Sequence, residues 1–150
     1  MTEVVIRSVD REAHRRPDGV DDATVAACGR VSEALEWIER ARGRLYDFHQ
    51  MLGHADFLFD DAATQLEEAG HVEAARDIRH HLIGRNVLDG RWTFQIVDEF
   101  DSLYYAEARR CDDEVCRNLM GGRRHVYEAE LKERRRTRGL PGHEARPPAR

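Results

Sequence analysis

The sequence has few of the features that mark membrane proteins or disulfide-built secreted proteins. Its 150 residues include only three cysteines and four prolines. No uninterrupted apolar run approaches the ~18 to 20 residues that span a bilayer, and charges flank the short apolar patch near the start, which argues against a signal peptide. Since three cysteines without a Cys-x-x-Cys motif favour reduced thiols, we expect a cytoplasmic protein without a membrane segment.

Lysine is almost absent, because 23 of the 24 basic residues are arginine and the other is Lys132. We attribute this bias to genome base composition, which weakens each arginine cluster as a sign of phosphate recognition. The charge is also uneven: residues 1–116 carry 14 Arg against 25 acidic residues, whereas residues 117–150 carry 10 basic against 4 acidic residues. The pattern predicts an acidic body with a basic C-terminal arm that contacts an anionic partner or folds back on its own domain.

The common catalytic motifs are missing as well. Ser8, Ser32 and Ser102 have no Gly-x-Ser-x-Gly setting. The one Glu-x-x-His motif, at 68–71, contains a glycine at an expected helix end and has no second good copy, so the chain departs from the ferritin-like di-metal pattern. The sequence therefore identifies no enzymatic activity.

A helical period dominates the middle of the chain. Apolar residues fall on positions of a four-three alternation, in which positions 42 and 49 are polar: Val31, Leu35, Ile38, Leu45 and Leu52. Asp21, Asp22 or Thr24 offers an N-cap for this long amphipathic helix. The pattern continues past Gly53, which predicts either one kinked helix or two nearly collinear ones.

Three further helices are expected. A shorter one covers 72–84 after a C-cap at Gly70, and Asp89-Gly90 forms a turn. A helical stripe then follows from Trp92, with Val97, Phe100, Tyr104, Cys111, Val115 and Leu119 as its members. It breaks at Gly121-Gly122, before a last helix at 125–136.

These elements predict an all-α fold, an antiparallel helical bundle of four to five helices with flexible termini. We expect a flexible leader at 1–20, a bundle domain at 21–137 and a flexible basic tail at 138–150.

Three polar residues interrupt the stripe of the first helix at intervals of seven: Arg42, His49 and Asp56. Each lies about 10.5 Å from the next along a helix, so the three cannot ligate one metal together. Their partners must come from another helix, where the candidates are Asp101, Tyr104 and Glu107.

Three interpretations of this polar line remain open. Its members pair with polar groups of a neighbouring helix on a packing seam and fix helix register and pairing, or they form a metal or ligand site, or they serve proton transfer. A carboxylate meeting His49 would fix its tautomer for proton transfer or for metal binding, with His49 and Glu107 as the candidate ligands of a divalent transition metal.

Two basic features could contact anions. The first is Gly121-Gly122-Arg123-Arg124-His125, where glycines and guanidinium groups precede a helix N-terminus; the alternative is an ordinary helix-turn-helix corner. The second is Arg134, Arg135, Arg136 and Arg138, which form either a solvated helix end or a nucleic-acid contact.

The aromatic residues exceed what one stripe per helix can cover. Trp37, for example, adjoins a core position and is suited to a cleft or a subunit interface. We therefore expect a protein partner or a homo-oligomer, although a core packed on both sides would explain the same residues.

The segments 35–42, 84–87 and 121–128 read Leu-Glu-Trp-Ile-Glu-Arg-Ala-Arg, Gly-Arg-Asn-Val and Gly-Gly-Arg-Arg-His-Val-Tyr-Glu. With them, the chain resembles a family of small uncharacterised helical proteins of high-GC, actinobacterial-type bacteria. The resemblance covers residues 30–143 and implies a folded body with a variable leader. It implies no activity, cofactor or catalytic residue.

Overall fold

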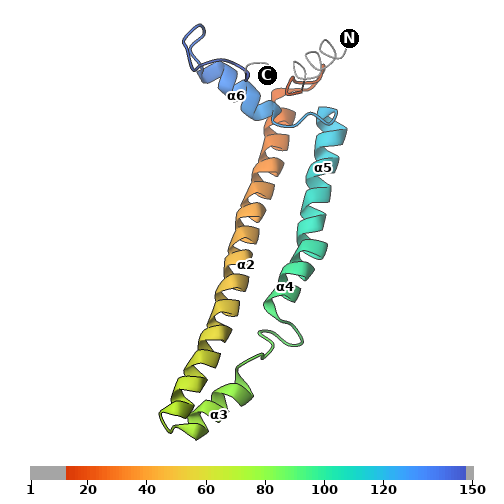
Figure 1. The fold of residues 1–150 in the computed structure, drawn as a ribbon. Coiled ribbons are helices and arrows are strands. Elements are labelled where there is room, and N and C mark those ends of the chain that lie inside the picture. Colours follow the sequence, from red (N-terminus) through yellow and green to blue (C-terminus); the bar gives the residue numbers. More distant parts are fainter. Residues whose placement is uncertain (1–12, 148–150) are drawn as a thin grey trace, which may run out of the picture. The chain divides into compact units, whose positions relative to one another are not determined.

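The computed structural model describes residues 13–147, and the regular structure in this range is helical (Figure 1). In chain order the elements are α2 (Asp22–Glu68), α3 (Val72–His81), α4 (Thr93–Phe100), the π-helix η1 (Asp101–Tyr105), α5 (Ala106–Met120) and α6 (Val126–Arg135). The predicted all-α class is confirmed for these residues, whereas the bundle arrangement stays a prediction. Residues 1–12 of the expected leader and 148–150 of the expected tail lie outside the described range. None of the described helices has the length and apolarity to cross a membrane.

The chain divides into two compact units. Unit 1 combines the residues up to Glu36 with those from Ala108 onward, and unit 2 consists of Trp37–Glu107. The helix α2 contributes its first turns to unit 1 and its longer remainder to unit 2. The predicted polar line of Arg42, His49 and Asp56 therefore belongs to unit 2. Unit 1 contains residues 121–125, which we call the glycine-arginine corner, and the arginines at 134–138, which we call the basic arm.

The helix α2 runs without interruption through Gly53, so this glycine does not end it. At its start the backbone N–H of Thr24 donates to Asp21 Oδ1 at 2.7 Å, which confirms one of the predicted N-caps. Hydrogen bonds from the side chain and the backbone of Thr24 lower the pKa of the Asp21 carboxyl. At its end Gly70 adopts a positive φ of 87°, and the N–H of His71 donates to the carbonyl of Leu66 at 2.8 Å. This is the geometry of a glycine C-cap, as predicted.

Two glycines inside α2 give opposite expectations for replacement by alanine. A Cβ at Gly43 would meet nothing within 4 Å, so Gly43→Ala is expected to raise the free energy of unfolding by about 1 kcal/mol through helix propensity alone. A Cβ at Gly29 would lie 3.0 Å from Tyr127 Cβ on α6. We expect Gly29→Ala to lower the free energy of unfolding, measured by urea denaturation, because α6 must shift. Equal gains for both variants would contradict this packing.

The sequence pattern placed the apolar stripe of α5 one residue out of phase. Of the predicted inward residues, Val115 is partly buried against the core, but Cys111 and Leu119 are exposed. The buried positions are Asp112, Cys116 and Met120. The preceding π-helix η1 accounts for this, because a π-turn holds one extra residue and so rotates the inward face by one position.

The core of unit 1 contains two of the three cysteines. Cys28 and Cys116 are buried with Val25, Met120 and Val126, and neither forms a disulfide. Burial raises the pKa of both thiols, which keeps them protonated. They act here as small apolar side chains, as predicted.

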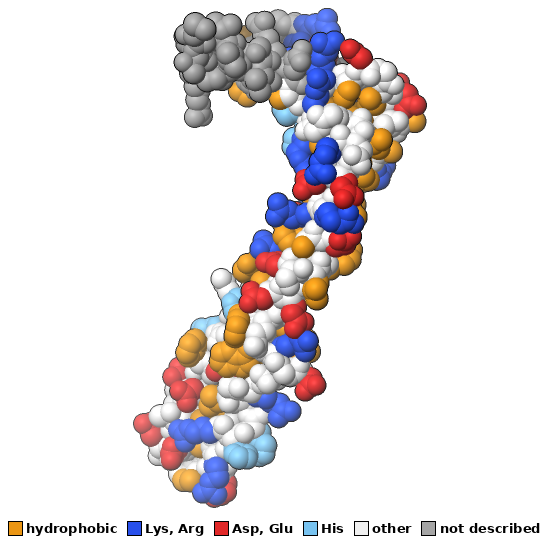
Figure 2. Space-filling view, turned by 90° about the vertical axis from the view of Figure 1, so that its right-hand side faces the viewer, with side chains coloured by type: hydrophobic (Ala, Val, Ile, Leu, Met, Phe, Trp, Pro, Cys, Tyr) orange, Lys and Arg blue, Asp and Glu red, His pale blue; other side chains and the backbone are white. Residues whose placement is uncertain are grey.

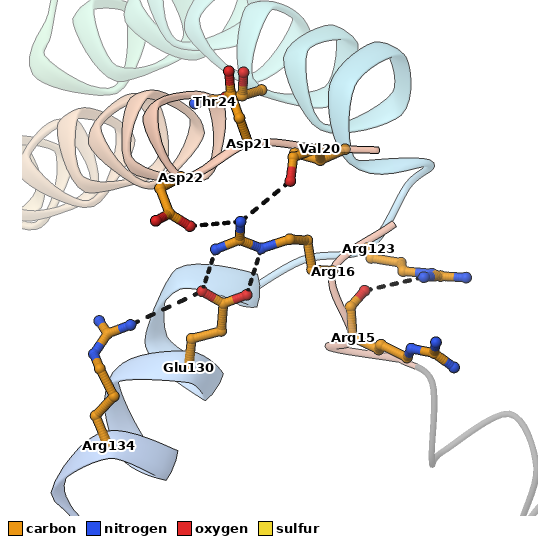
Figure 3. A network of polar contacts seen from close by, with 9 residues as sticks. All are labelled: Arg15, Arg16, Val20, Asp21, Asp22, Thr24, Arg123, Glu130 and Arg134. Atoms are coloured by element: carbon orange, nitrogen blue, oxygen red, sulfur yellow. Dashed lines mark hydrogen bonds and ion pairs between the residues drawn. The ribbon is translucent and has the colours of Figure 1, made fainter. Parts of the chain in front are cut away.

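An arginine ahead of α2 ties that segment to α6 (Figure 3). Arg16 donates through Nε and Nη2 to the two carboxylate oxygens of Glu130, each at 2.8 Å, and through Nη1 to the carbonyl of Val20. The same guanidinium lies 2.7 Å from Asp22. The Arg16 hydrogen bonds lower the pKa of Glu130. Residue 16 therefore belongs to the packed part of unit 1.

Two alanines of unit 2 are fully buried, Ala63 on α2 and Ala75 on α3. The same two helices are joined by Arg79 of α3, which donates to Glu67 of α2 at 2.5 Å. The predicted turn at Asp89-Gly90 is present, closed by a bridge between Leu88 and Arg91. The chain then enters α4.

Candidate functional site

The polar line of α2 lies on its half-buried face in unit 2. Arg42, His49 and Asp56 are all partly buried, and each bonds to a different segment of the returning chain. Because successive members are about 10.5 Å apart along the helix, they meet three successive segments rather than one common point. The prediction that the His49 ring faces other segments of the chain is confirmed.

Arg42 makes the strongest of these contacts, with Asp101 of η1. Its Nε and Nη2 donate to the two carboxylate oxygens at 2.7 and 2.8 Å, a bidentate pair. The guanidinium also lies over the rings of Tyr46 and Tyr105, 5.1 and 4.9 Å from their centroids. The Arg42 hydrogen bonds hold the pKa of the Asp101 carboxyl below its usual range. Asp101 is thus a predicted partner that the structure brings to the polar line.

His49 meets a hydroxyl rather than a carboxylate. Its Nδ1 lies 2.6 Å from Oγ1 of Thr93, the buried first residue of α4. Thr93 is not among the predicted partners. Of the three that are, Asp101 bonds to Arg42 instead. Tyr104 is exposed and lies beside Phe100 at a centroid distance of 6.1 Å, and Glu107 is exposed as well.

Asp56 receives a hydrogen bond from the loop after α3. The backbone N–H of Gly84 donates to Asp56 Oδ1 at 2.9 Å. Gly84 has a φ of 71°, the left-handed conformation that favours glycine. Together the three contacts hold the loop, α4 and η1 against one face of α2.

A cleft of about 260 Å³ opens beside His49 and Asp56. Its lining comprises His49, Leu52, Gly53, Asp56, Phe57, Arg85, Val87, Trp92, Thr93 and Phe94. Phe57 is 73% exposed, and Trp92 and Phe94 are exposed too, so aromatic rings surround the opening. The indole N–H of Trp92 donates to the carbonyl of Arg85 at 3.0 Å and fixes that ring.

Figure 2 shows a cluster of hydrophobic side chains just below the middle of the visible face, with histidines beside it and charged side chains around it. Apolar surface of this kind on a small protein marks contact sites. The cleft combines such surface with the polar groups of His49, Asp56 and Thr93. An apolar cleft with a few convergent polar groups is the usual form of a binding site, and we take it as the candidate functional site of unit 2.

The two predicted metal ligands are His49, which contacts Thr93, and Glu107, which is exposed. Among residues 13–147, no group of three or more His, Cys, Asp and Glu side chains is placed to hold a metal ion.

In unit 1 the glycine-arginine corner is tied to a buried carboxylate. Asp112 is 2% exposed and accepts hydrogen bonds from Arg124 Nη1 at 2.6 Å and from Ser32 Oγ at 2.8 Å. Arg124 also pairs with Asp113, and Arg123 donates to a backbone carbonyl of residue 15. Both guanidinium groups are therefore bonded within their own unit.

The backbone of this corner is left-handed over several residues. Gly121, Gly122 and His125 have φ values of 57°, 77° and 60°. His125, the N-cap of α6, makes no side-chain cap hydrogen bond. These backbone conformations suit a sharp reversal of the chain between α5 and α6. They favour the interpretation of this segment as an ordinary helix-turn-helix corner.

Three of the four arginines named for the basic arm lie beside acidic side chains of α6. Arg136 donates to both carboxylate oxygens of Glu133, and Arg138 donates to one of them at 3.0 Å. Arg134 lies 4.0 Å from Glu130. The acidic side chains therefore neutralise part of the charge that was expected to attract nucleic acid.

Comparison with known proteins adds no assignment. No protein-family model matches the chain, and neither the curated proteins nor the solved structures contain a match. The cleft geometry is thus the main guide to function.

Proposed function

We propose that the protein is an interaction or regulatory module, and that the cleft of unit 2 receives an apolar side chain of a protein partner. One observation supports this most strongly: three exposed aromatic rings, Phe57, Trp92 and Phe94, surround a cleft with polar groups on its wall. Aromatic residues of this kind dominate the energetics of protein interfaces.

The size of the cleft suits one large side chain of a protein partner. Its volume of about 260 Å³ lies near the lower end of the roughly 300 to 1,000 Å³ range of pockets that enclose a drug-sized molecule. A single large side chain fits such a volume, and the surrounding exposed rings supply further contact area.

A second candidate is a small ligand held beside His49. It is favoured by the position of His49 on the wall of the same cleft. The His49 ring is oriented by Thr93, and an oriented imidazole is a specific hydrogen-bonding group for a polar ligand.

Photo-crosslinking distinguishes a protein partner from a free ligand. A benzophenone amino acid replaces Phe57 in one variant and Leu103 in another; Leu103 is 66% exposed, belongs to unit 2 and lies outside the cleft. We expect a protein to be cross-linked from position 57 and not from position 103. That protein is then purified and its affinity measured.

Phe57→Ala is expected to weaken this affinity at least about tenfold, as truncation of a central aromatic contact does. Leu103→Ala is expected to leave it unchanged. Equal binding by Phe57→Ala and the unchanged protein would refute the proposal, and so would the absence of any product specific to position 57.

A further inference from the structure

A second apolar stripe runs along α2 within unit 2, beside the one that faces the returning chain. Its members alternate at spacings of four and three: Trp37, Ala41, Arg44, Phe48, Met51, Ala55, Leu58 and Ala62. This 4-3 spacing places all eight on one side of the helix. We call it the outer stripe.

The large apolar side chains of the outer stripe are exposed in the single chain, whereas Ala55 and Ala62 are partly buried. Trp37 is 62% and Met51 63% exposed, and Phe48 and Leu58 are exposed as well. Its one charged residue, Arg44, pairs with Asp47 at 3.1 Å. These four large apolar side chains are not buried when the single chain folds. A row of exposed apolar side chains on one helix face is typical of a surface that binds a partner.

The outer stripe is complementary to itself when two copies run antiparallel. A two-fold axis between Phe48 and Met51 produces four kinds of contact: Trp37 with the partner's Ala62, Ala41 with the partner's Leu58, Arg44 with the partner's Ala55, and Phe48 with the partner's Met51. In three of the four, a large side chain meets alanine. Such alternation lets two helices approach closely while filling the space between them.

The charged residues beside the outer stripe are complementary in the same antiparallel alignment. Arg40, Asp47, His54 and Asp61 follow one another at intervals of seven along its border, and all are exposed. In the antiparallel pair Arg40 lies opposite the partner's Asp61, and Asp47 lies opposite the partner's His54. Each acidic group therefore meets a cation or a hydrogen-bond donor.

Other registers lack this match. A parallel pair sets Arg44 against the partner's Arg44. An antiparallel pair moved by one heptad sets Asp47 against either the partner's Asp47 or the partner's Asp61. Opposed like charges disfavour both arrangements.

We propose that the occupant of the outer stripe is a second copy of this chain, bound antiparallel through α2 about a two-fold axis between Phe48 and Met51. The symmetry is that of an isologous dimer, in which one surface binds itself. The paired segment, residues 37–62, is about 37 Å long at ~1.5 Å per residue. The outer stripe lies apart from the cleft, so each proposal can fail without the other.

Sedimentation equilibrium of the full chain at tens of micromolar tests the dimer. The expected mass is twice that of the monomer, and Met51→Glu is expected to weaken association on the order of 100-fold, because it buries a charge at the two-fold axis. Leu103→Glu, equally exposed in unit 2 but outside the stripe, is expected to leave the mass unchanged. The proposal would be overturned if the wild-type protein sediments as a monomer. It would also be overturned if the Met51→Glu variant associates as tightly as the wild-type protein.

Cysteine cross-linking tests the register, in a Cys111→Ser background because Cys111 is exposed. Ala41→Cys combined with Leu58→Cys is expected to form disulfide-linked dimers on mild oxidation, since these positions meet across the antiparallel interface. Either substitution alone is expected to form none. Cross-linking by Ala41→Cys alone would indicate a parallel pair and overturn the proposed register.

Discussion

Asp112→Ala is expected to lower the free energy of unfolding by about 3 kcal/mol, since it removes two hydrogen bonds to a buried carboxylate, one of them from a charged donor. Asp112 is 2% exposed and bonds to both Arg124 and Ser32. It joins the start of α2 to the corner before α6, so its loss affects the whole packing of unit 1. Urea unfolding followed by circular dichroism measures the change.

Asp113→Ala provides the matched control. Asp113 also pairs with Arg124, but it is half exposed, and exposed ion pairs contribute only about 0 to 1 kcal/mol. We expect the control to cost less than 1 kcal/mol on that basis. Similar losses for the two variants would show that burial of Asp112 does not determine its contribution.

Arg42→Met is expected to make unit 2 less stable at neutral pH and to remove a component of its acid sensitivity. The Asp101 pKa is lowered in the folded protein by the Arg42 hydrogen bonds. A carboxyl with a lowered folded pKa stabilises the fold above its unfolded pKa of about 3.9, and this contribution is lost as the pH falls through the folded pKa. The stability difference between the two proteins should therefore be full above about pH 5 and shrink below about pH 4.

A double-mutant cycle isolates this contribution. The stabilities of Arg42→Met, Asp101→Asn and the combined variant yield the coupling between the two side chains. We expect a favourable coupling at pH 7 that diminishes toward pH 3. A coupling that stays constant over this range would mean that the Asp101 charge does not contribute.

The sequence was most informative about α2. Its 4-3 period predicted the helix, and the three polar residues at intervals of seven predicted a line of contacts along its half-buried face. Asp101 could be named because it lies close to the apolar stripe of the next helix. The caps at Asp21 and Gly70 could be predicted because capping depends on local chemistry.

Contacts that depend on tertiary geometry were beyond the sequence. Thr93 was missed as the partner of His49 because nothing local distinguishes it from an ordinary first helical residue. Asp112 was missed because the extra residue of η1 shifts the phase of α5, and the stripe was assigned without it. A signal was present: Asp112, Cys116 and Met120 follow one another at intervals of four.

The role of Arg16 could not be predicted either. It lies 114 positions from Glu130 in the sequence, in a polar stretch without a helical period. Only the folded chain brings the two together.

The most direct test of the proposed function compares Gly53→Leu with Gly43→Leu in binding to the protein cross-linked from position 57. Both glycines are interior to α2, and a Cβ at either meets nothing within 4 Å, so both variants should fold with at least the original helix stability. Only Gly53 lines the cleft. We predict that Gly53→Leu weakens the affinity at least about tenfold by filling the cleft, while Gly43→Leu binds normally; equal affinities for the two variants would contradict the assignment of this cleft as the binding site.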